Sequence, residues 1–259
     1  MTRLRLSHPV LKSEAFLIRK FLIDKFDYTS QRVSFLKNEM YFRPNFYVEL
    51  VRQKYKMSNE EKIRNLMEHV GRYGFYFFCG RKGSGKTTLS YFLYQRIKEF
   101  FPKKEVYVRN MEAKAGMKEY ENFDLKNAYQ NLPENSVLFH DEVHYDIPPN
   151  LSSRSDEYKN LRRYFSTQRH KGTVIIQISQ TTNGFHKDLL RYCDGQFYLR
   201  TSIISDLERK EFRPYIEMSQ EILEGDWRFV FLNDTEIFQV EYERPDFMSG
   251  KDSFYYKED

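Results

Sequence analysis

Apolar residues recur along the chain with two different spacings. Between Ser13 and Phe26 they fall at helical intervals with basic residues between them, which predicts an amphipathic helix. A second helix is predicted to open at Ser58, where Glu61 three residues later completes a capping box, and to stop at Gly71. The aromatic-rich segment 31–56 gives mixed signals and predicts no element.

From Tyr73 onward, short apolar runs alternate with helical patterns, which is typical of a parallel sheet covered by helices on both faces. An α/β fold with a mostly parallel sheet is therefore expected. Later, 227–243 alternates apolar and polar residues around a turn at 233–235 and predicts a β-hairpin, whereas 244–259 has the pattern of an irregular tail. The predicted strands of the sheet are 74–79, 105–109, 136–140, 173–179 and 196–201, and the predicted helices are 86–100 and 156–168.

These patterns divide the chain into three parts. We expect a basic, mainly helical N-terminal extension over 1–72, an α/β core over 73–201, and a C-terminal hairpin and tail over 202–259. The net charge of +5 is uneven, because residues 1–70 hold 14 of the 42 Lys and Arg against 8 of the 37 Asp and Glu, which leaves 28 against 29 for the rest. The basic excess is either a solvated surface or an electrostatic handle for a polyanion.

Composition excludes several classes of protein. Hydrophobic residues at 40% and charged residues at 31% are typical of a globular chain and not of a disordered one. The two cysteines, Cys79 and Cys193, are too few for a disulfide framework or a four-ligand zinc site, which favours a reducing cytosol. No apolar run approaches the roughly 18 to 20 residues of a membrane helix, and the first residues lack the pattern of a secretory signal. A cytoplasmic location without a membrane span is expected.

The stretch "CGRKGSGKTT" has the pattern of a phosphate-binding loop: Gly80, four residues, then Gly85, Lys86 and Thr87, after a predicted strand and before a predicted helix. Glycines let the backbone N–H groups turn toward phosphates, and the helix N-terminus adds partial positive charge. We expect Lys86 to bridge the β- and γ-phosphates of ATP and the Thr87 hydroxyl to coordinate Mg²⁺. The predicted nucleotide-binding residues are Gly80, Gly83, Ser84, Gly85, Lys86, Thr87 and Thr88.

A second motif, "SVLFHDE", ends a predicted strand in two carboxylates. Asp141 is placed to hold Mg²⁺, and Glu142 to orient and deprotonate an attacking water. The adjacent pair favours hydrolysis over transfer of phosphate to a small substrate, although a surface acidic pair after a core strand would have the same letters. His140 stands where an apolar residue is expected, and nothing in the sequence accounts for it.

The stretch "STQRHKGTVIIQISQ" predicts a buried strand with polar ends. If this strand belongs to the same sheet, Gln180 lies beside Lys86 and Glu142, where its amide can sense the γ-phosphate. An ordinary strand-end amide is the alternative. At the other end, Arg169 lies away from its own site and could reach a neighbour's nucleotide in a ring, with Arg162, Arg163 and Arg191 as rivals for that role. A solvated helix terminus would explain Arg169 equally well.

Four blocks together, "GRKGSGKTT", "VLFHDEVH", "STQRHKGTVIIQISQ" and "KDLLRYCDGQFYLR", resemble the HerA/FtsK superfamily of DNA-pumping ATPases. The acid-x-His of Glu142 to His144 and the Q-R-H-x-G before the fourth strand are similar to the branch with zonular occludens toxin-like proteins, filamentous-phage assembly ATPases and viral genome-packaging ATPases. The resemblance covers about 73–201. It departs at Ser179, where the family usually has threonine, and in lacking the membrane span typical of filamentous-phage assembly ATPases.

The resemblance implies a RecA-like P-loop NTPase fold with an extra strand between those that bear the two nucleotide motifs, a ring that is commonly a hexamer, and DNA threaded through it. The leading hypothesis is a Mg²⁺-dependent, ring-forming ATPase that translocates DNA, such as a viral genome-packaging motor docking on a capsid. In that case it would act in the host cytoplasm or with the virion. The alternatives are an assembly or secretion ATPase that docks on a membrane partner, and a nucleotide-switched DNA-binding adaptor or loader.

Overall fold

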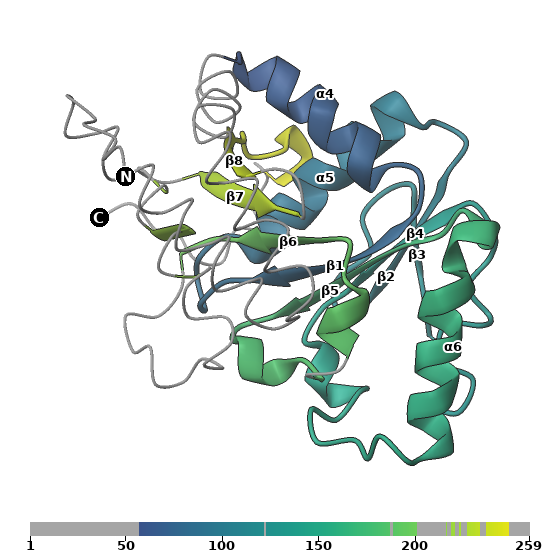
Figure 1. Ribbon diagram of the computed structural model, residues 1–259. Helices are drawn as coiled ribbons and strands as arrows, with labels where there is room; N and C mark the ends of the chain where they lie inside the picture. The colour runs from purple at the N-terminus through teal and green to yellow at the C-terminus, as the bar shows by residue number, and fades with distance from the viewer. Residues whose placement is uncertain are drawn as a thin grey trace, which may run out of the picture.

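The computed structural model describes residues 57–121, 123–186, 189–200, 216, 219–220, 223, 227–233 and 237–248. The centre of the molecule is one eight-stranded sheet with the strand order β3-β2-β4-β5-β1-β6-β7-β8 (Figure 1). The pairings from β3 to β6 are parallel, and β7 and β8 add antiparallel strands at one side. The predicted α/β class with a mostly parallel sheet is confirmed.

Most predicted elements are present with the expected bounds. The structure extends one helix to Lys171, begins β5 one residue after its predicted start, begins β6 one residue before its predicted start and ends it at Tyr198, and adds the unpredicted β3. In chain order the helices and strands are α4 (Asn59–Val70), β1 (Gly74–Cys79), α5 (Lys86–Phe100), β2 (Glu105–Arg109), β3 (Met117–Glu119), β4 (Ser136–His140), α6 (Asp156–Lys171), β5 (Val174–Ser179), β6 (Gly195–Tyr198), β7 (Arg228–Leu232) and β8 (Ile237–Glu241).

Short 3-10 turns connect several of these elements. They are η1 (Val143–Tyr145), η2 (Thr182–Gly184), η3 (Leu189–Tyr192) and η5 (Asp246–Met248). The last of these places one turn of regular structure in the segment expected to be an irregular tail. The turn η1 directly follows the two carboxylates at the end of β4, so its geometry bears on the candidate site.

Strand β5 lies between β1 and β4 and is parallel to both. Cys79 at the end of β1 pairs with Ser179 at the end of β5, and His140 at the end of β4 pairs with Gln177. The residues that follow the three strands therefore emerge at one edge of the sheet, where ligands of open α/β sheets bind. This is the extra strand that the resemblance implied.

Helices cover both faces of the sheet: α4 and α5 lie on one side and α6 on the other (Figure 1). Successive side chains of a strand point to opposite faces, and β1 is buried on both. Tyr76 and Phe78 pack in the cluster that contains the buried residues of α4 and α5, whereas Phe75 and Phe77 pack in the cluster of α6. Burial on both faces explains why β1 is a continuous apolar run rather than an alternating one.

The hairpin of β7 and β8 is confirmed and extends the central sheet through pairing of β7 with β6. Helix α4 joins this end of the sheet, because the Asn59 amide donates to the Glu241 carbonyl at 2.8 Å and accepts from the Glu241 N–H at 2.9 Å. The capping box is also confirmed, with Glu61 N–H bound to the Ser58 hydroxyl and the Glu61 carboxylate bound to Ser58 N–H.

Two expectations reach beyond the described residues. The amphipathic helix over 13–26 lies outside them, and the division at 72/73 and 201/202 stays a prediction. In the part of the chain that the structure describes, no helix combines the length and the apolar character required to cross a membrane.

Candidate active site

The predicted phosphate-binding loop joins β1 to α5, as its sequence pattern requires. Gly83 and Gly85 have φ values of 78° and 90°, a left-handed backbone that glycine adopts readily. The ammonium group of Lys86 lies over this loop and donates to the carbonyls of Gly80 at 2.9 Å and Arg81 at 3.3 Å. An ammonium group has three N–H donors, so one remains for a phosphate oxygen.

The phosphate-binding loop is closely packed around Gly80 and Ser84. A Cβ atom at Gly80 would lie 2.5 Å from the Ser84 hydroxyl oxygen and 2.9 Å from Leu199 Cβ, so a side chain there has no room. The Ser84 hydroxyl is buried and has no hydrogen-bond partner within the described structure. A buried polar atom without a partner is costly, and a phosphate oxygen would satisfy it. This observation fits a phosphate group in the loop.

Asp141 follows β4, and its carboxylate interacts electrostatically with the ammonium group of Lys86. Burial raises the pKa of Asp141 above its ordinary value, and the hydrogen bond from Glu142 N–H at 2.9 Å opposes that shift. Burial lowers the pKa of Lys86, and the charges of Asp141 and Glu142 oppose it. Each partner therefore favours the charged form of the other.

Asp141 and Thr87 fit a Mg²⁺ ion by the chemistry of their donors. Mg²⁺ is commonly bound through oxygen atoms of one or two protein groups, with water and substrate phosphates as the other ligands. Among the described residues, no group of three or more His, Cys, Asp or Glu side chains could hold a metal by itself. Asp141 and Thr87 thus offer two oxygen ligands of the kind that Mg²⁺ takes beside substrate phosphates.

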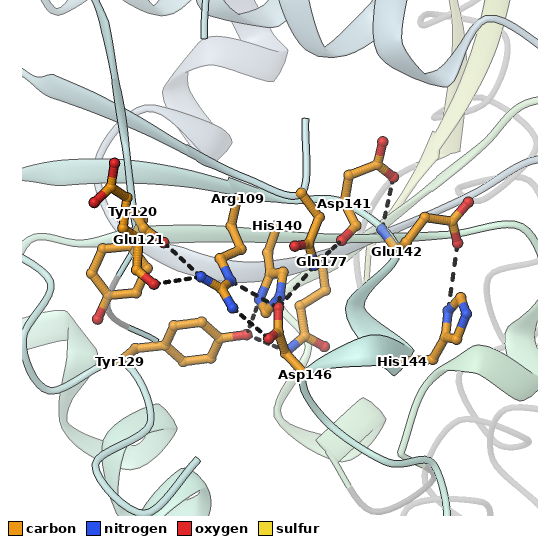
Figure 2. A network of polar contacts seen from close by, with 11 residues as sticks. Arg109, Tyr120, Glu121, Tyr129, His140, Asp141, Glu142, His144, Asp146 and Gln177 are labelled. Carbon is orange, nitrogen blue, oxygen red and sulfur yellow. Dashed lines mark hydrogen bonds and ion pairs between the residues drawn. The ribbon is translucent and has the colours of Figure 1, made fainter. Parts of the chain in front are cut away.

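Glu142 is held in an unusual conformation. Its φ of 42° and ψ of 49° are left-handed, a region that disfavours side chains with a Cβ by about 1–2 kcal/mol. The Gln180 amide nitrogen donates to Glu142 Oε1 at 2.6 Å, which confirms the expected proximity of these two residues. On the other side Glu142 Oε2 lies 3.4 Å from His144 Nδ1 (Figure 2). Strain of this kind persists only where surrounding contacts enforce it.

Arg169 lies at the opposite end of the sheet from the phosphate-binding loop. It is in the last turn of α6, which Gly172 ends with a φ of 62°, and its guanidinium group is exposed. It lies 5.7 Å above the ring of Tyr73, and its Nη2 is 3.6 Å from Asp194 Oδ1. Arg162 and Arg163 are also exposed on α6, and the side chain of Arg191 is outside the described part. That Arg169 acts on the nucleotide of a neighbouring subunit in a ring stays a prediction.

No protein-family model matches this chain, and no curated protein matches it. Solved structures do. The genome packaging NTPase B204 from Sulfolobus turreted icosahedral virus 2, in complex with AMP, is 14% identical over 65% of this chain and 97% of its own, with a TM-score of 0.49. The N-terminal domain of zonular occludens toxin from Neisseria meningitidis is 16% identical over 68% of this chain and 96% of its own, with a TM-score of 0.48.

A third similar structure is the monomer form of the pCW3 conjugation coupling protein TcpA with ATPγS, 11% identical over 66% of this chain and 60% of its own, with a TM-score of 0.48.

Two features of the site have no local sequence signal. Tyr242, which follows β8, is buried, and its hydroxyl donates to the Gly85 carbonyl at 3.5 Å. A Cβ atom at Gly85 would lie 2.7 Å from that hydroxyl. The C-terminal hairpin therefore contacts the phosphate-binding loop across more than 150 residues of chain.

The second feature explains His140. Its ring is fully buried between the Tyr129 hydroxyl, 2.8 Å from Nδ1, and the Asp146 carboxylate, 2.7 Å from Nε2. Burial lowers the pKa of His140, and the bond to Asp146 opposes that shift. Arg109 and His140 hold the pKa of the Asp146 carboxyl well below its usual range. The polar residue in this apolar strand is thus one member of a buried network.

Proposed function

We propose that the chain is an ATPase that hydrolyses ATP with Mg²⁺ at the edge of the sheet formed by the ends of β1, β5 and β4. The contact of 2.6 Å between Gln180 and Glu142 carries this proposal, because it joins a candidate sensor and a candidate base from neighbouring strands beside the phosphate-binding loop. The strand order supports it by placing the Gln180 strand between the other two.

In this proposal the loop and α5 bind the phosphates of ATP. Lys86 neutralises the γ-phosphate, and the Ser84 hydroxyl gains a hydrogen bond in place of none. Thr87 and Asp141 hold Mg²⁺, which supplies positive charge for the phosphate oxygens when it is bound. Glu142 accepts a proton from a water molecule, the water oxygen bonds to the γ-phosphorus, and the bond from that phosphorus to the ADP oxygen breaks.

Gln180 gives the site a means to sense the γ-phosphate. Its amide group has two N–H donors, of which one binds Glu142 Oε1 and the other would donate to a γ-phosphate oxygen. Gln180 would therefore bridge the base and the γ-phosphate. Loss of the γ-phosphate would leave the second donor without this partner, which distinguishes the ATP-bound site from the ADP-bound one.

We extend the proposal to a ring that moves DNA, as in a genome-packaging motor. The four motif blocks support this part by their resemblance to DNA-pumping ATPases, and Arg169 supports it by lying away from the nucleotide edge of its own subunit. In the ring, Arg169 neutralises charge at the nucleotide of a neighbouring subunit. A docking partner on a capsid or membrane is part of the same proposal.

The hydrolytic part is tested with Glu142→Gln and Lys86→Ala. Glu142→Gln should bind ATP with wild-type affinity and hardly hydrolyse it, whereas Lys86→Ala should lose ATP binding. A fluorescent ATP analogue measures binding, and phosphate release measures turnover. Hydrolysis at the wild-type rate in Glu142→Gln would overturn the assignment of the base.

The ring is tested by mixing two inactive variants. Arg169→Ala subunits keep an intact nucleotide site, and Glu142→Gln subunits keep the arginine. Activity should return on mixing if Arg169 acts on the neighbour, because an intact site then meets an intact arginine. No recovery would reject the role in trans. ATPase rates with single- and double-stranded DNA, measured with mass in solution, test translocation. A stable monomer whose slow hydrolysis ignores DNA would instead favour the adaptor.

A further inference from the structure

A chain of polar side chains lies beneath the loop that bears Glu142 (Figure 2). Gln177 of β5 donates through Nε2 to the Tyr129 hydroxyl at 2.8 Å, which lies 2.8 Å from Nδ1 of His140. His140 Nε2 is 2.7 Å from Asp146, and Asp146 receives two bonds from Arg109 of β2, at 2.9 Å to Oδ2 and 2.7 Å to Oδ1. Three neighbouring strands, β5, β4 and β2, thus meet in this network.

The bonds of the chain run in one direction. Because the Tyr129 oxygen accepts from Gln177, its own proton is directed at His140 Nδ1. Nδ1 is then an acceptor, so the ring proton is on Nε2 and is donated to the Asp146 carboxylate. Tyr129 and His140 are fully buried, and the Arg109 and Asp146 side chains are 20% and 13% exposed. The network ends on a paired charge that is largely shielded from water.

Asp146 is the residue at which this network holds the loop. It caps the C-terminus of η1, the turn that begins after Glu142, and its N–H donates to the Val143 carbonyl at 3.1 Å. Asn110 binds both the Asp146 carboxylate at 2.8 Å and the Asp141 carbonyl at 3.1 Å. Asp141 N–H in turn donates to the Arg109 carbonyl at 2.9 Å. Both ends of the 141–146 loop are therefore fastened to the end of β2.

We propose that Arg109 and Asp146 are positioning residues for hydrolysis, which hold the 141–146 loop in the left-handed turn that keeps the Glu142 carboxylate at Gln180. The same network reaches Gln177 of β5, and Gln180 directly follows that strand, so both members of the Glu142–Gln180 pair share one support. This inference rests on the proposed role of Glu142 as the base.

The proposal predicts a loss of turnover without a loss of ATP binding. Arg109→Met removes both bonds to Asp146, together with those to the Tyr120 and Glu121 carbonyls, and loosens the loop. A displacement of about 1 Å at a reacting group lowers rates by up to about a hundredfold. We expect kcat to fall by about tenfold to a hundredfold, while the affinity for the ATP analogue stays within about twofold. Arg109→Lys keeps the charge but not the two parallel bonds, so it should recover part of the lost kcat.

Two controls separate positioning from folding. Lys118→Met removes another cation that is ion-paired to β2, at 2.6 Å from Glu105, and should leave kcat unchanged. The number of ATP-analogue sites per chain reports the folded fraction, because a folding defect lowers kcat and the number of sites together. Asp146→Asn provides a second variant that keeps the shape of the side chain, and it should lower kcat in the same way.

The possible failures are distinguishable. If the wild-type protein hydrolyses ATP and Glu142→Gln does not, but Arg109→Met and Asp146→Asn keep wild-type kcat at full site number, the positioning role is rejected and the proposed function stands. If kcat and site number fall in parallel, the network serves folding only and the positioning role is likewise rejected. If Glu142→Gln hydrolyses at the wild-type rate, the assignment of the base fails first.

Discussion

The left-handed backbone of Glu142 leads to a prediction in which two equally inactive variants differ in stability. Glu142→Ala and Glu142→Gly both remove the carboxylate and its contact with Gln180, so both should bind ATP and lose hydrolysis. They differ only in the Cβ atom. At a φ of 42° a Cβ is disfavoured by about 1–2 kcal/mol, and the greater freedom of glycine in the unfolded chain offsets about 0.5–1 kcal/mol of this.

Glu142→Gly should therefore be more stable than Glu142→Ala by roughly 0.7 kcal/mol. For a chain of this size, such a difference moves the midpoint of thermal unfolding by about 1–3 °C. Differential scanning calorimetry and urea unfolding, each without nucleotide, measure the difference. The comparison of two variants cancels the lost Gln180 contact, which a comparison with the wild-type protein would not.

An exposed position in the middle of a helix gives the matched control. Ser166 lies on the exposed face of α6, where Ser166→Ala should be more stable than Ser166→Gly by about 1 kcal/mol. The order of the alanine and glycine variants is thus expected to reverse between the two positions. If alanine is at least as stable as glycine at position 142, Glu142 is not left-handed in solution, and the idea that the loop must hold it under strain is refuted.

Three other predictions concern the surroundings of the site. Burial lowers the pKa of Lys104 to about 8, so folding disfavours its protonated form. The free energy of unfolding of the wild-type protein, measured with urea relative to Lys104→Met, should therefore rise as the pH increases from about 8 to 10.4. Below about pH 8 this difference should stay level. Gly85→Ala should destabilise the fold more than Gly83→Ala, because both glycines are left-handed but only Gly85 faces the Tyr242 hydroxyl at 2.7 Å from an added Cβ; denaturant midpoints rank them. Ser58→Ala should lower the free energy of unfolding by about 1 kcal/mol in the same assay, with the loss of the helix cap.

Local sequence patterns were sufficient for the elements of the core. The strands β1, β4 and β5 are short apolar runs buried on both faces, and the loop after β1 has a spacing that few other structures require. Short β3 was missed because only Met117 of its three residues is buried, which leaves no pattern to detect.

Other features depend on contacts between distant residues. His140 and Gln177 interrupt apolar strands, and the partner that explains both, Tyr129, lies in the segment between β3 and β4. The approach of Tyr242 to Gly85 likewise depends on how the hairpin joins the sheet. The left-handed turn at Glu142 has no signal either, since glycine or asparagine would be the usual residue there.

The Asn59 side chain also determines how this sheet can meet other chains. By occupying the N–H and C=O of Glu241, it takes the backbone groups that an added strand would need at the end of the outermost described strand, β8. At the opposite side, β3 is only three residues long and exposes Lys118 and Glu119. Short, charged or covered edges prevent sheets from joining into aggregates. In the described part of the chain, these two edges therefore disfavour a sheet that continues from one copy into another.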